Sequence, residues 1–284
     1  MHSEASVGVV AIHDQIADAI RARITAGELA PGDPIPTIEQ LRTQWHCAAG
    51  PVRTALSILR NEGLITGGRG KPAVVRQPPR RIRLPLGWSQ QMKDVALQPE
   101  DKRAVTGAIE LTIGTELDET DFICRYEEVV ADNDLAAEFS LSPGTPLVRR
   151  AYELTDKQTG LRVFYSVSHI PRKLIEANPD LLDECKEPWP GGHLHQLYTV
   201  GIEVDRFVRS LIAVQPTHGT RQKWGMEPGV PLLRVRSRSI DILDRVVEVS
   251  DATYPADRVE IEFTEQLIRW PEDHPRYVRD GQRA

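Results

Sequence analysis

Apolar residues recur at helical spacing near the start of the chain. Ile12, Ile16, Ile20 and Ile24 follow one another every four residues, with polar residues and alanines between them. This spacing predicts an amphipathic helix from about Val10 to Ala26. One face of the helix is apolar, so we expect it to pack against a small core.

Two shorter helical patterns follow a turn at Ala30–Asp33. Thr37 is expected to cap a helix that runs to about Gln44, with Leu41 facing inward. After a predicted tight turn over Cys47–Gly50, a second apolar stripe closed by Gly63 is formed by Val52, Ala55, Leu56 and Leu59.

A basic hairpin completes this region. Leu64–Thr66 and Ala73–Val75 are typical of two short strands, and the glycine-rich segment Gly67–Lys71 is expected to join them. Three helices followed by a basic hairpin make a winged helix-turn-helix, in which the third helix enters the major groove of DNA and the hairpin tip reaches phosphates. The alternative is a generic helical cap with a solvated loop, which the order and spacing of the elements disfavour.

The remainder of the chain contains an internal repeat. Three segments recur in the same order, at offsets of 87, 85 and 84 residues: Gly114–Asp118 and Gly201–Asp205, Pro143–Arg149 and Pro228–Arg234, Tyr165–Ser166 and Val249–Ser250. Each copy predicts a strand, a short helix, a Pro-Gly turn and two further strands, with the helices at Asn133–Phe139 and Gly219–Trp224. Two such copies predict an α+β domain with an antiparallel sheet, helices on one side and a cavity between the halves.

Charge divides unevenly along the 284 residues. The net charge is −6, yet Met1–Arg83 holds 11 Lys and Arg against 7 Asp and Glu. A basic head on an acidic body permits DNA binding despite the overall charge. Three cysteines without CxxC spacing, no export leader and no apolar run of membrane length predict a reduced, cytoplasmic protein without a membrane partner.

Two N-terminal stretches form a joint motif. Gly27–Pro36 is GELAPGDPIP, and Val52–Leu56 is followed by Asn61–Ile65 (VRTAL, NEGLI). They resemble the SGxLxPGxxLPS and VRxALxxLxxEGLI signatures of GntR-type regulators over about Ile12 to Val75. The resemblance implies a winged helix-turn-helix that binds a double-stranded DNA operator.

The likeness is weaker at the usual DNA contacts of that family. Thr37–Glu39 stands where the family has SER, Ala48–Arg53 stands where it has SRxTVR, and Pro72 interrupts the wing motif GxGT. Because only Arg53 is clearly retained, we expect affinity to depend on it, on the wing and on backbone N–H groups. The predicted DNA-binding residues are Thr37, Gln40, Ala48, Ala49, Gly50, Arg53, Arg69, Gly70 and Lys71.

The C-terminal region carries a second resemblance. Glu138–Leu147 and Val246–Ser250, with Tyr254 and Asp257–Arg258, are similar to motifs of the UTRA ligand-binding domain, which shares its fold with chorismate lyase. Together the likenesses imply the HutC-like branch of the GntR family, whose UTRA domain binds small effectors and dimerises. We expect the DNA-binding domain over 1–76, a linker over 77–85, a UTRA-like domain over 86–270 and a tail over 271–284.

An effector site is expected between the repeated halves. Arg149 and Arg150 point to opposite sides of their strand, so one can enter the cavity, where an arginine suits a carboxylate or phosphate. We favour Arg150, with a surface ion pair as the alternative. Ser166 stands where UTRA domains often have glutamate. A small polar or anionic effector is therefore expected to contact Arg149, Arg150, Ser166, Glu248 and Tyr254.

Enzymatic and metal motifs are weak. No Ser/His/Asp order, phosphate-binding loop or carboxylate pair stands out, and His193 and His195, with Cys185 upstream, lie in a predicted loop. We therefore predict no catalytic residue, cofactor or metal. The leading interpretation is a homodimeric repressor controlled by an effector. A chorismate-lyase-like enzyme with a DNA-binding head and a ligand-free DNA-binding or partner-recruiting protein stay open.

Overall fold

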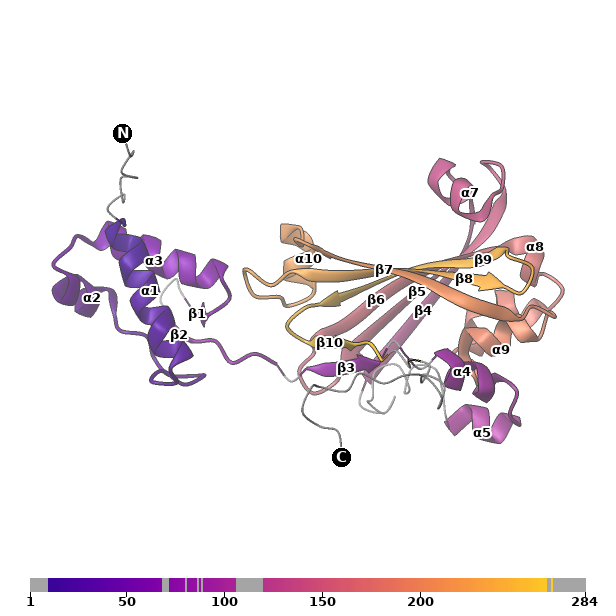
Figure 1. Ribbon diagram of the computed structural model, residues 1–284, viewed down its shortest axis with the longest axis horizontal. Helices are drawn as coiled ribbons and strands as arrows, with labels where there is room; N and C mark the ends of the chain where they lie inside the picture. Colours follow the sequence, from indigo (N-terminus) through magenta and orange to yellow (C-terminus); the bar gives the residue numbers. More distant parts are fainter. Residues whose placement is uncertain are drawn as a thin grey trace, which may run out of the picture.

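The computed structural model describes residues 10–67, 72–79, 81–85, 87, 89–105, 120–264 and 267. They form a head and a larger body (Figure 1). In the head, three helices precede a two-stranded antiparallel hairpin: α1 (Ile12–Thr25), α2 (Ile38–Trp45), α3 (Ala49–Asn61), β1 (Ile65–Thr66) and β2 (Val74–Val75). The order and type of these elements agree with the sequence prediction.

The apolar stripes of the three helices meet in one core. Ile16 and Ile20 of α1, Leu41 of α2 and Val52 and Leu59 of α3 are almost fully buried there. Burial of such side chains contributes about 1.5–3 kcal/mol each, which holds the short helices together.

The start of α3 differs from the prediction. Ala49 and Gly50, expected in the turn, are the first two residues of the helix, and Ala48 is its N-cap. Pro51 is the third helical residue, a position at which its missing N–H needs no partner.

The body is built on a six-stranded antiparallel sheet, as the repeat predicts. Its order is β4-β5-β6-β9-β8-β7, so each half contributes three neighbouring strands and the halves join where β6 pairs with β9. We call this junction the seam. The strands are β4 (Thr120–Val130), β5 (Pro146–Asp156), β6 (Arg162–Pro171), β7 (Val204–Val214), β8 (Leu232–Asp241) and β9 (Val246–Pro255).

The seam has an approximate two-fold axis. Val167 of β6 lies opposite Asp251 of β9, and Ser166 lies opposite Ala252. Val167 and Asp251 are 84 residues apart, which equals the offset of the repeat at Tyr165 and Val249. A residue that faces its own repeat equivalent must lie on the symmetry axis, so the axis passes between Val167 and Asp251. The N-terminal repeat segment Gly114–Asp118 lies outside the described residues.

Helices cover both sides of the sheet (Figure 1). The repeat helices α7 (Asn133–Phe139) and α10 (His218–Lys223) lie on one side, and α4 (Ser89–Ala96) and α9 (Gly192–Tyr198) lie on the other. We call these the repeat-helix side and the roof side. Short helices complete the chain: α5 (Glu100–Val105), α8 (Arg172–Ile175), η2 (Pro179–Leu182) and η3 (Glu184–Lys186).

The connection between head and body is partly a strand. Within the predicted linker 77–85, Ile82–Pro85 forms β3, which pairs in parallel with β10 (Val259–Glu262). The end of the linker therefore belongs to the body, because its backbone hydrogen bonds are made there. The predicted tail 271–284 lies outside the described residues.

Candidate functional site

The exposed side of α3 presents few long polar side chains. Gly50, Arg53, Thr54 and Ser57 are exposed, while the opposite side of the helix is buried in the head core. Arg53 is thus placed as predicted for a residue that contacts DNA. Thr54 and Ser57 were missed by the sequence analysis, although Ser57 is four residues from Arg53 and three from Thr54 and therefore neighbours both on the helix surface.

The other predicted DNA-binding residues divide into three groups. Thr37 and Gln40 are exposed but engaged in a capping box, in which the Thr37 hydroxyl accepts from the Gln40 backbone N–H (3.2 Å) and the Gln40 side chain accepts from the Thr37 N–H (2.8 Å). At the start of α3, Ala48 is exposed and Ala49 is half-buried. Arg69, Gly70 and Lys71 lie outside the described residues.

A cavity of about 260 Å³ lies on the roof side of the sheet. Its lining comes from strands of both halves, from Met92 of α4 and from His193 and Gln196 of α9. It therefore crosses the seam, where the repeat analysis expected a cavity. Ser166, Glu248 and Tyr254, three of the residues that the sequence analysis proposed for the effector site, are among its lining residues.

The register of the strands brings a row of hydroxyl groups into this cavity. Ser168 of β6 pairs with Ser250 of β9, Ser250 pairs with Ser237 of β8, and Ser237 pairs with Arg209 of β7. All four side chains line the cavity. We call these four residues, three serines that end in Arg209, the serine row. Ser168 is only 3% exposed, and its hydroxyl makes no hydrogen bond to any described residue. A buried hydroxyl without a partner costs free energy, which a bound polar molecule would recover.

Arg209 is the cationic side chain of the cavity lining. Its guanidinium lies 4.4 Å from the centre of the Phe207 ring and donates to the Ser89 hydroxyl of α4 (3.1 Å). Burial lowers the pKa of Arg209, but a guanidinium remains charged at neutral pH. The sequence analysis did not find this residue.

Glu248 lies in the next row of the cavity. Its side chain is almost fully buried, accepts from the Ser239 hydroxyl (3.1 Å) and lies 3.4 Å from Nε2 of His193. Tyr254, six residues further along β9, packs against Phe164, with ring centres 5.9 Å apart. Burial raises the pKa of Tyr254 to about 12, so its hydroxyl stays neutral and can donate.

Arg150 does not line the cavity, which corrects the favoured assignment. It is 1% exposed and donates to the Gln196 side-chain oxygen (2.6 Å) and the Leu181 carbonyl (2.9 Å), with its guanidinium 4.9 Å from the Tyr126 ring. Alternation placed it on the correct side of the sheet, but η2 and α9 cover it. Arg150 therefore positions Gln196, which does line the cavity.

Arg149 points to the opposite side of the sheet. It forms an ion pair with Glu127 (2.8 Å) and donates to the Tyr165 hydroxyl (3.1 Å). It is therefore separated from the cavity by the sheet itself, and its assignment to the effector site is also corrected.

Glu187 holds one wall of the cavity. Its carboxylate accepts from the hydroxyl of Tyr126, from the hydroxyl of Tyr152 (3.2 Å), from Nε2 of Gln196 (2.9 Å) and from the backbone of Trp189 (2.8 Å). Burial is the main cause that raises the pKa values of both tyrosines, which keeps them neutral as donors. Such a filled hydrogen-bond network fixes the wall before a ligand arrives.

His193 and His195 lie on α9 rather than in the predicted loop. His193 faces Glu248, whereas Nδ1 of His195 accepts from the Trp189 indole (2.8 Å). The two imidazoles thus have different neighbours. Within the part of the chain that the structure describes, no three His, Cys, Asp or Glu side chains gather as a metal site would require.

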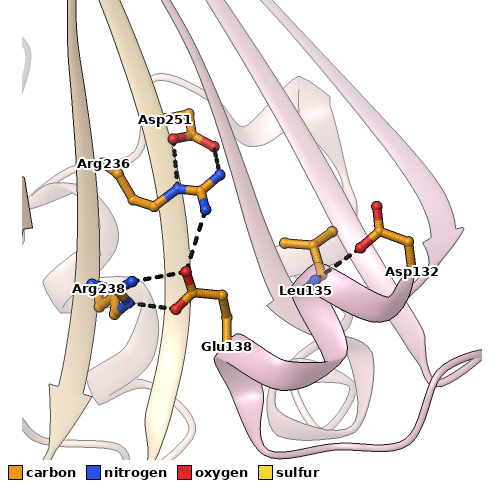
Figure 2. Close-up of polar contacts among 6 residues, drawn as sticks. All are labelled: Asp132, Leu135, Glu138, Arg236, Arg238 and Asp251. Carbon is orange, nitrogen blue, oxygen red and sulfur yellow. Dashed lines mark hydrogen bonds and ion pairs between the residues drawn. The ribbon is translucent and has the colours of Figure 1, made fainter. Parts of the chain in front are cut away.

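On the repeat-helix side, charged residues tie α7 to the second half (Figure 2). Arg238 donates two bonds to Glu138 of α7, one of them 2.8 Å long, and Arg236 donates to Glu138 (3.3 Å) and to both oxygens of Asp251 (2.9 and 2.8 Å). Hydrogen bonding to Arg238 is the main cause that lowers the pKa of Glu138.

Among the described residues, the head contacts the body near Arg76 and near the end of α3. Arg76, directly after β2, forms a buried ion pair with Asp257 in the turn between β9 and β10. At the second point Gly229 approaches the end of α3 so closely that a Cβ there would overlap the Asn61 carbonyl. Since Tyr254 lines the cavity and Asp257 follows three residues later, the cavity and the head are joined by a short piece of chain.

Family models match both parts of the chain. Residues 12–75 match the bacterial regulatory proteins of the gntR family, and residues 122–260 match the UTRA domain. The first match covers the head, and the second covers the six strands of the large sheet.

Individual relatives agree over most of their length. The chain is 23% identical over 262 residues to an HTH-type transcriptional regulator of Rhizobium meliloti (89% of this chain, 94% of the relative). It is 24% identical over 249 residues to the mannosyl-D-glycerate transport/metabolism system repressor MngR of Escherichia coli (87% and 92%). A crystal structure of a GntR-family transcriptional regulator superposes with a TM-score of 0.68 at 20% identity, covering 91% of this chain and 99% of that one.

No described helix is both long and apolar enough to cross a membrane. The two family matches follow one another in the order that the sequence motifs predicted, with a DNA-binding head before an effector-binding body. The chain belongs to the gntR family of bacterial regulatory proteins and is a transcriptional regulator with a UTRA domain.

Proposed function

We propose that the protein is a homodimeric repressor that leaves its operator when a small polar molecule binds in the cavity at the seam. In this proposal residues 1–76 bind DNA, residues 86–270 bind the effector and dimerise, and the protein acts in the cytoplasm. The observation that carries it is the hydroxyl-lined cavity at the seam, in which the buried Ser168 hydroxyl makes no hydrogen bond to any described residue.

Repression is supported by the name of the relative MngR, a repressor similar over 87% of this chain. The homodimer is supported by the exposed side of α3, where Arg53 is the one long polar side chain among the described residues. A head with so few side chains for base contacts needs a second copy to reach useful specificity. Sedimentation should give a dimer at micromolar concentration, and a monomer that binds DNA 1:1 would contradict this part.

The effector step is tested with a blocked cavity. Ala252 lines the cavity, and the neighbouring Thr253 alternates to the repeat-helix side. We expect Ala252→Leu to keep operator affinity but to lose release by small polar metabolites, because the added side chain occupies the cavity. Thr253→Leu is the matched control and should respond like the wild type.

The measurement is fluorescence anisotropy of an operator obtained by in vitro selection, titrated with a library of small polar metabolites. Circular dichroism establishes that each variant is folded. A wild-type protein that no library compound releases, or an Ala252→Leu variant that responds fully, contradicts effector control through this cavity.

A further inference from the structure

We propose that the effector is an extended, hydroxyl-rich carboxylate that lies across the strands, with its carboxylate on Arg209 and its hydroxyls on the serine row and Glu248. The inference rests on the proposed function, because it names the class of molecule that the same cavity takes. It does not depend on the direction of the regulatory response.

The serine row sets the direction in which the ligand lies. Its four residues occupy four consecutive strands, β6, β9, β8 and β7, and face one another in register. Neighbouring strands are about 4.8 Å apart, so the backbones at Ser168 and Arg209 are about 14 Å apart. The three serines therefore offer hydroxyl groups about 4.8 Å apart. Hydroxyls three or four carbons apart on an extended polyol can match this spacing better than a compact ligand can.

The distribution of charge sets the two ends of the ligand. Glu187 already accepts four hydrogen bonds, and the guanidinium of Arg150 lies next to the same tyrosines, so this wall is satisfied. Glu248 accepts one hydrogen bond, from Ser239, among the described residues, and His193 stands beside it. A carboxylate can accept about four, so Glu248 favours hydroxyl donors and repels an anion.

Arg209 lies on the edge strand β7, two strands away from Glu248 of β9. It is the cation of the cavity lining, and its stacking on Phe207 and its bond to Ser89 hold the guanidinium in place. A guanidinium presents paired N–H groups that match a carboxylate, and partial burial strengthens that interaction. The anionic end of the ligand is therefore expected at Arg209 and the hydroxyl-bearing end toward Glu248.

The experiment compares four five-carbon probes by isothermal titration calorimetry on the full chain. D-Ribonate carries both features, ribitol lacks the carboxylate, 1-amino-1-deoxyribitol replaces it with a cation, and pentanoate lacks the hydroxyls. We expect D-ribonate to bind about tenfold more tightly, or better, than each of the others.

Protein variants test which end of the ligand Arg209 and Glu248 each contact. Arg209→Gln should reduce D-ribonate affinity to that of ribitol and leave ribitol unchanged, and Arg209→Lys should restore part of the loss. Glu248→Gln should weaken D-ribonate and ribitol alike. Arg206→Gln is the control on the same strand, since Arg206 is exposed and paired with Asp205 and Asp244. Operator binding and circular dichroism show that each variant is folded.

Four results overturn the inference: equal or tighter binding of pentanoate, preference for the amine, unchanged D-ribonate affinity in Arg209→Gln, or no binding of any probe. The proposed function fails by a different result, namely the absence of cavity-dependent release with every compound of the metabolite library. A library compound of another class that releases the operator would therefore disprove the ligand class and leave effector control standing.

Discussion

The two halves of the body share a backbone plan but differ in chemistry. Each has a strand, a helix and two further strands, related by the axis between Val167 and Asp251. Both repeat helices lie on the same side of the sheet; α7 contacts β9 of the other half, and Trp224, directly after α10, contacts Tyr165 of β6. Contacts at each repeat helix therefore hold the two halves together. We call the ion pairs of Glu138 on α7 the ionic lock and the contacts of Trp224 after α10 the aromatic lock.

The two locks use different interactions. α7 is tied to β8 by the ion pairs of Glu138 with Arg236 and Arg238 (Figure 2). The turn after α10 instead carries Trp224, which packs edge-on against Tyr165 of β6 at 6.4 Å and lies 5.5 Å from the Arg162 guanidinium. Related backbone positions can therefore be stabilised either by charge or by apolar contact, and the two should respond differently to mutation and to pH.

The segments that follow each half also differ. After β6 the chain forms α8, η2, η3 and α9, and this segment lines the cavity through Glu187 and residues of α9. After β9 it makes the short turn that holds Asp257 against Arg76 of the head. The segment after the first half therefore helps to line the cavity, while the segment after the second half contacts the head.

The largest effect should come from the aromatic lock. Trp224 is 6% exposed, and Trp224→Ala should lower the free energy of unfolding by about 3–5 kcal/mol, because a large cavity forms beside Tyr165. Urea unfolding measures the loss. Tyr198→Ala removes an exposed aromatic and is the control. A loss below about 1 kcal/mol for Trp224→Ala would show that this lock does not hold the halves.

The next largest effect should come from the adjacent arginines of β5, Arg149 and Arg150, whose replacements should lower the free energy of unfolding by different amounts. Arg150→Met should cost about 3 kcal/mol, since Gln196 and the Leu181 carbonyl lose a buried charged donor. Arg149→Met removes an ion pair with the exposed Glu127 and should cost about 1 kcal/mol or less. Equal losses by chemical denaturation would contradict the assignment of the two side chains to opposite sides of the sheet.

The ion pair between Arg76 of the head and Asp257 of the second half should have an effect of intermediate size on the free energy of unfolding. A double-mutant cycle of Arg76→Gln and Asp257→Asn is expected to give a coupling energy of about 1–3 kcal/mol, because both side chains are buried. The free energies of unfolding of the four proteins measure it. Additive losses would mean that the ion pair does not join head and body.

The ionic lock should be the weakest and should depend on pH. Hydrogen bonding to Arg238 lowers the pKa of folded Glu138, so its stabilisation is complete above the unfolded pKa of about 4.3 and is lost as pH falls through the lowered value. The advantage of the wild type over Glu138→Gln should be about 1 kcal/mol or less near neutral pH, because water screens the pair. It should vanish in acid. A difference that stays constant from pH 7 to pH 2 would exclude this ionic lock.

The head could be predicted almost element by element from the sequence. Its helices carry regular apolar stripes, and glycines or the capping residue Thr37 mark their ends. The sheet of the body was also predictable, because the repeat fixes the order of strands and turns. The head and the sheet were predictable because local sequence patterns determine them. The UTRA motif pointed to Glu248 and Tyr254, which line the cavity.

The details of the cavity depended on contacts that are distant in sequence. Alternation on β5 separates Arg149 from Arg150, of which we favoured Arg150 for the cavity. Arg150 does face the roof side, but Gln196, 46 residues later, covers it. Arg209 enters the cavity through the pairing of β7 with β8, whose register shifts near Val204–Arg206, so alternation alone could not place it. The helix α9 was taken for a loop because its start is rich in glycine and proline, although Gly191 there adopts a left-handed conformation (φ +87°) just before the helix.

The axis at the seam has an evolutionary consequence. Two separate copies of one half, pairing their third strands, would build the same sheet, so duplication and fusion of a gene for a half-domain accounts for the present body. Two identical chains would have to offer identical groups on both sides of their axis. Once fused, each half could mutate by itself, and Arg209 and Glu248 could come to stand in one half without copies in the other. Fusion thereby allows a protein with symmetric ancestry to recognise a molecule whose two ends differ.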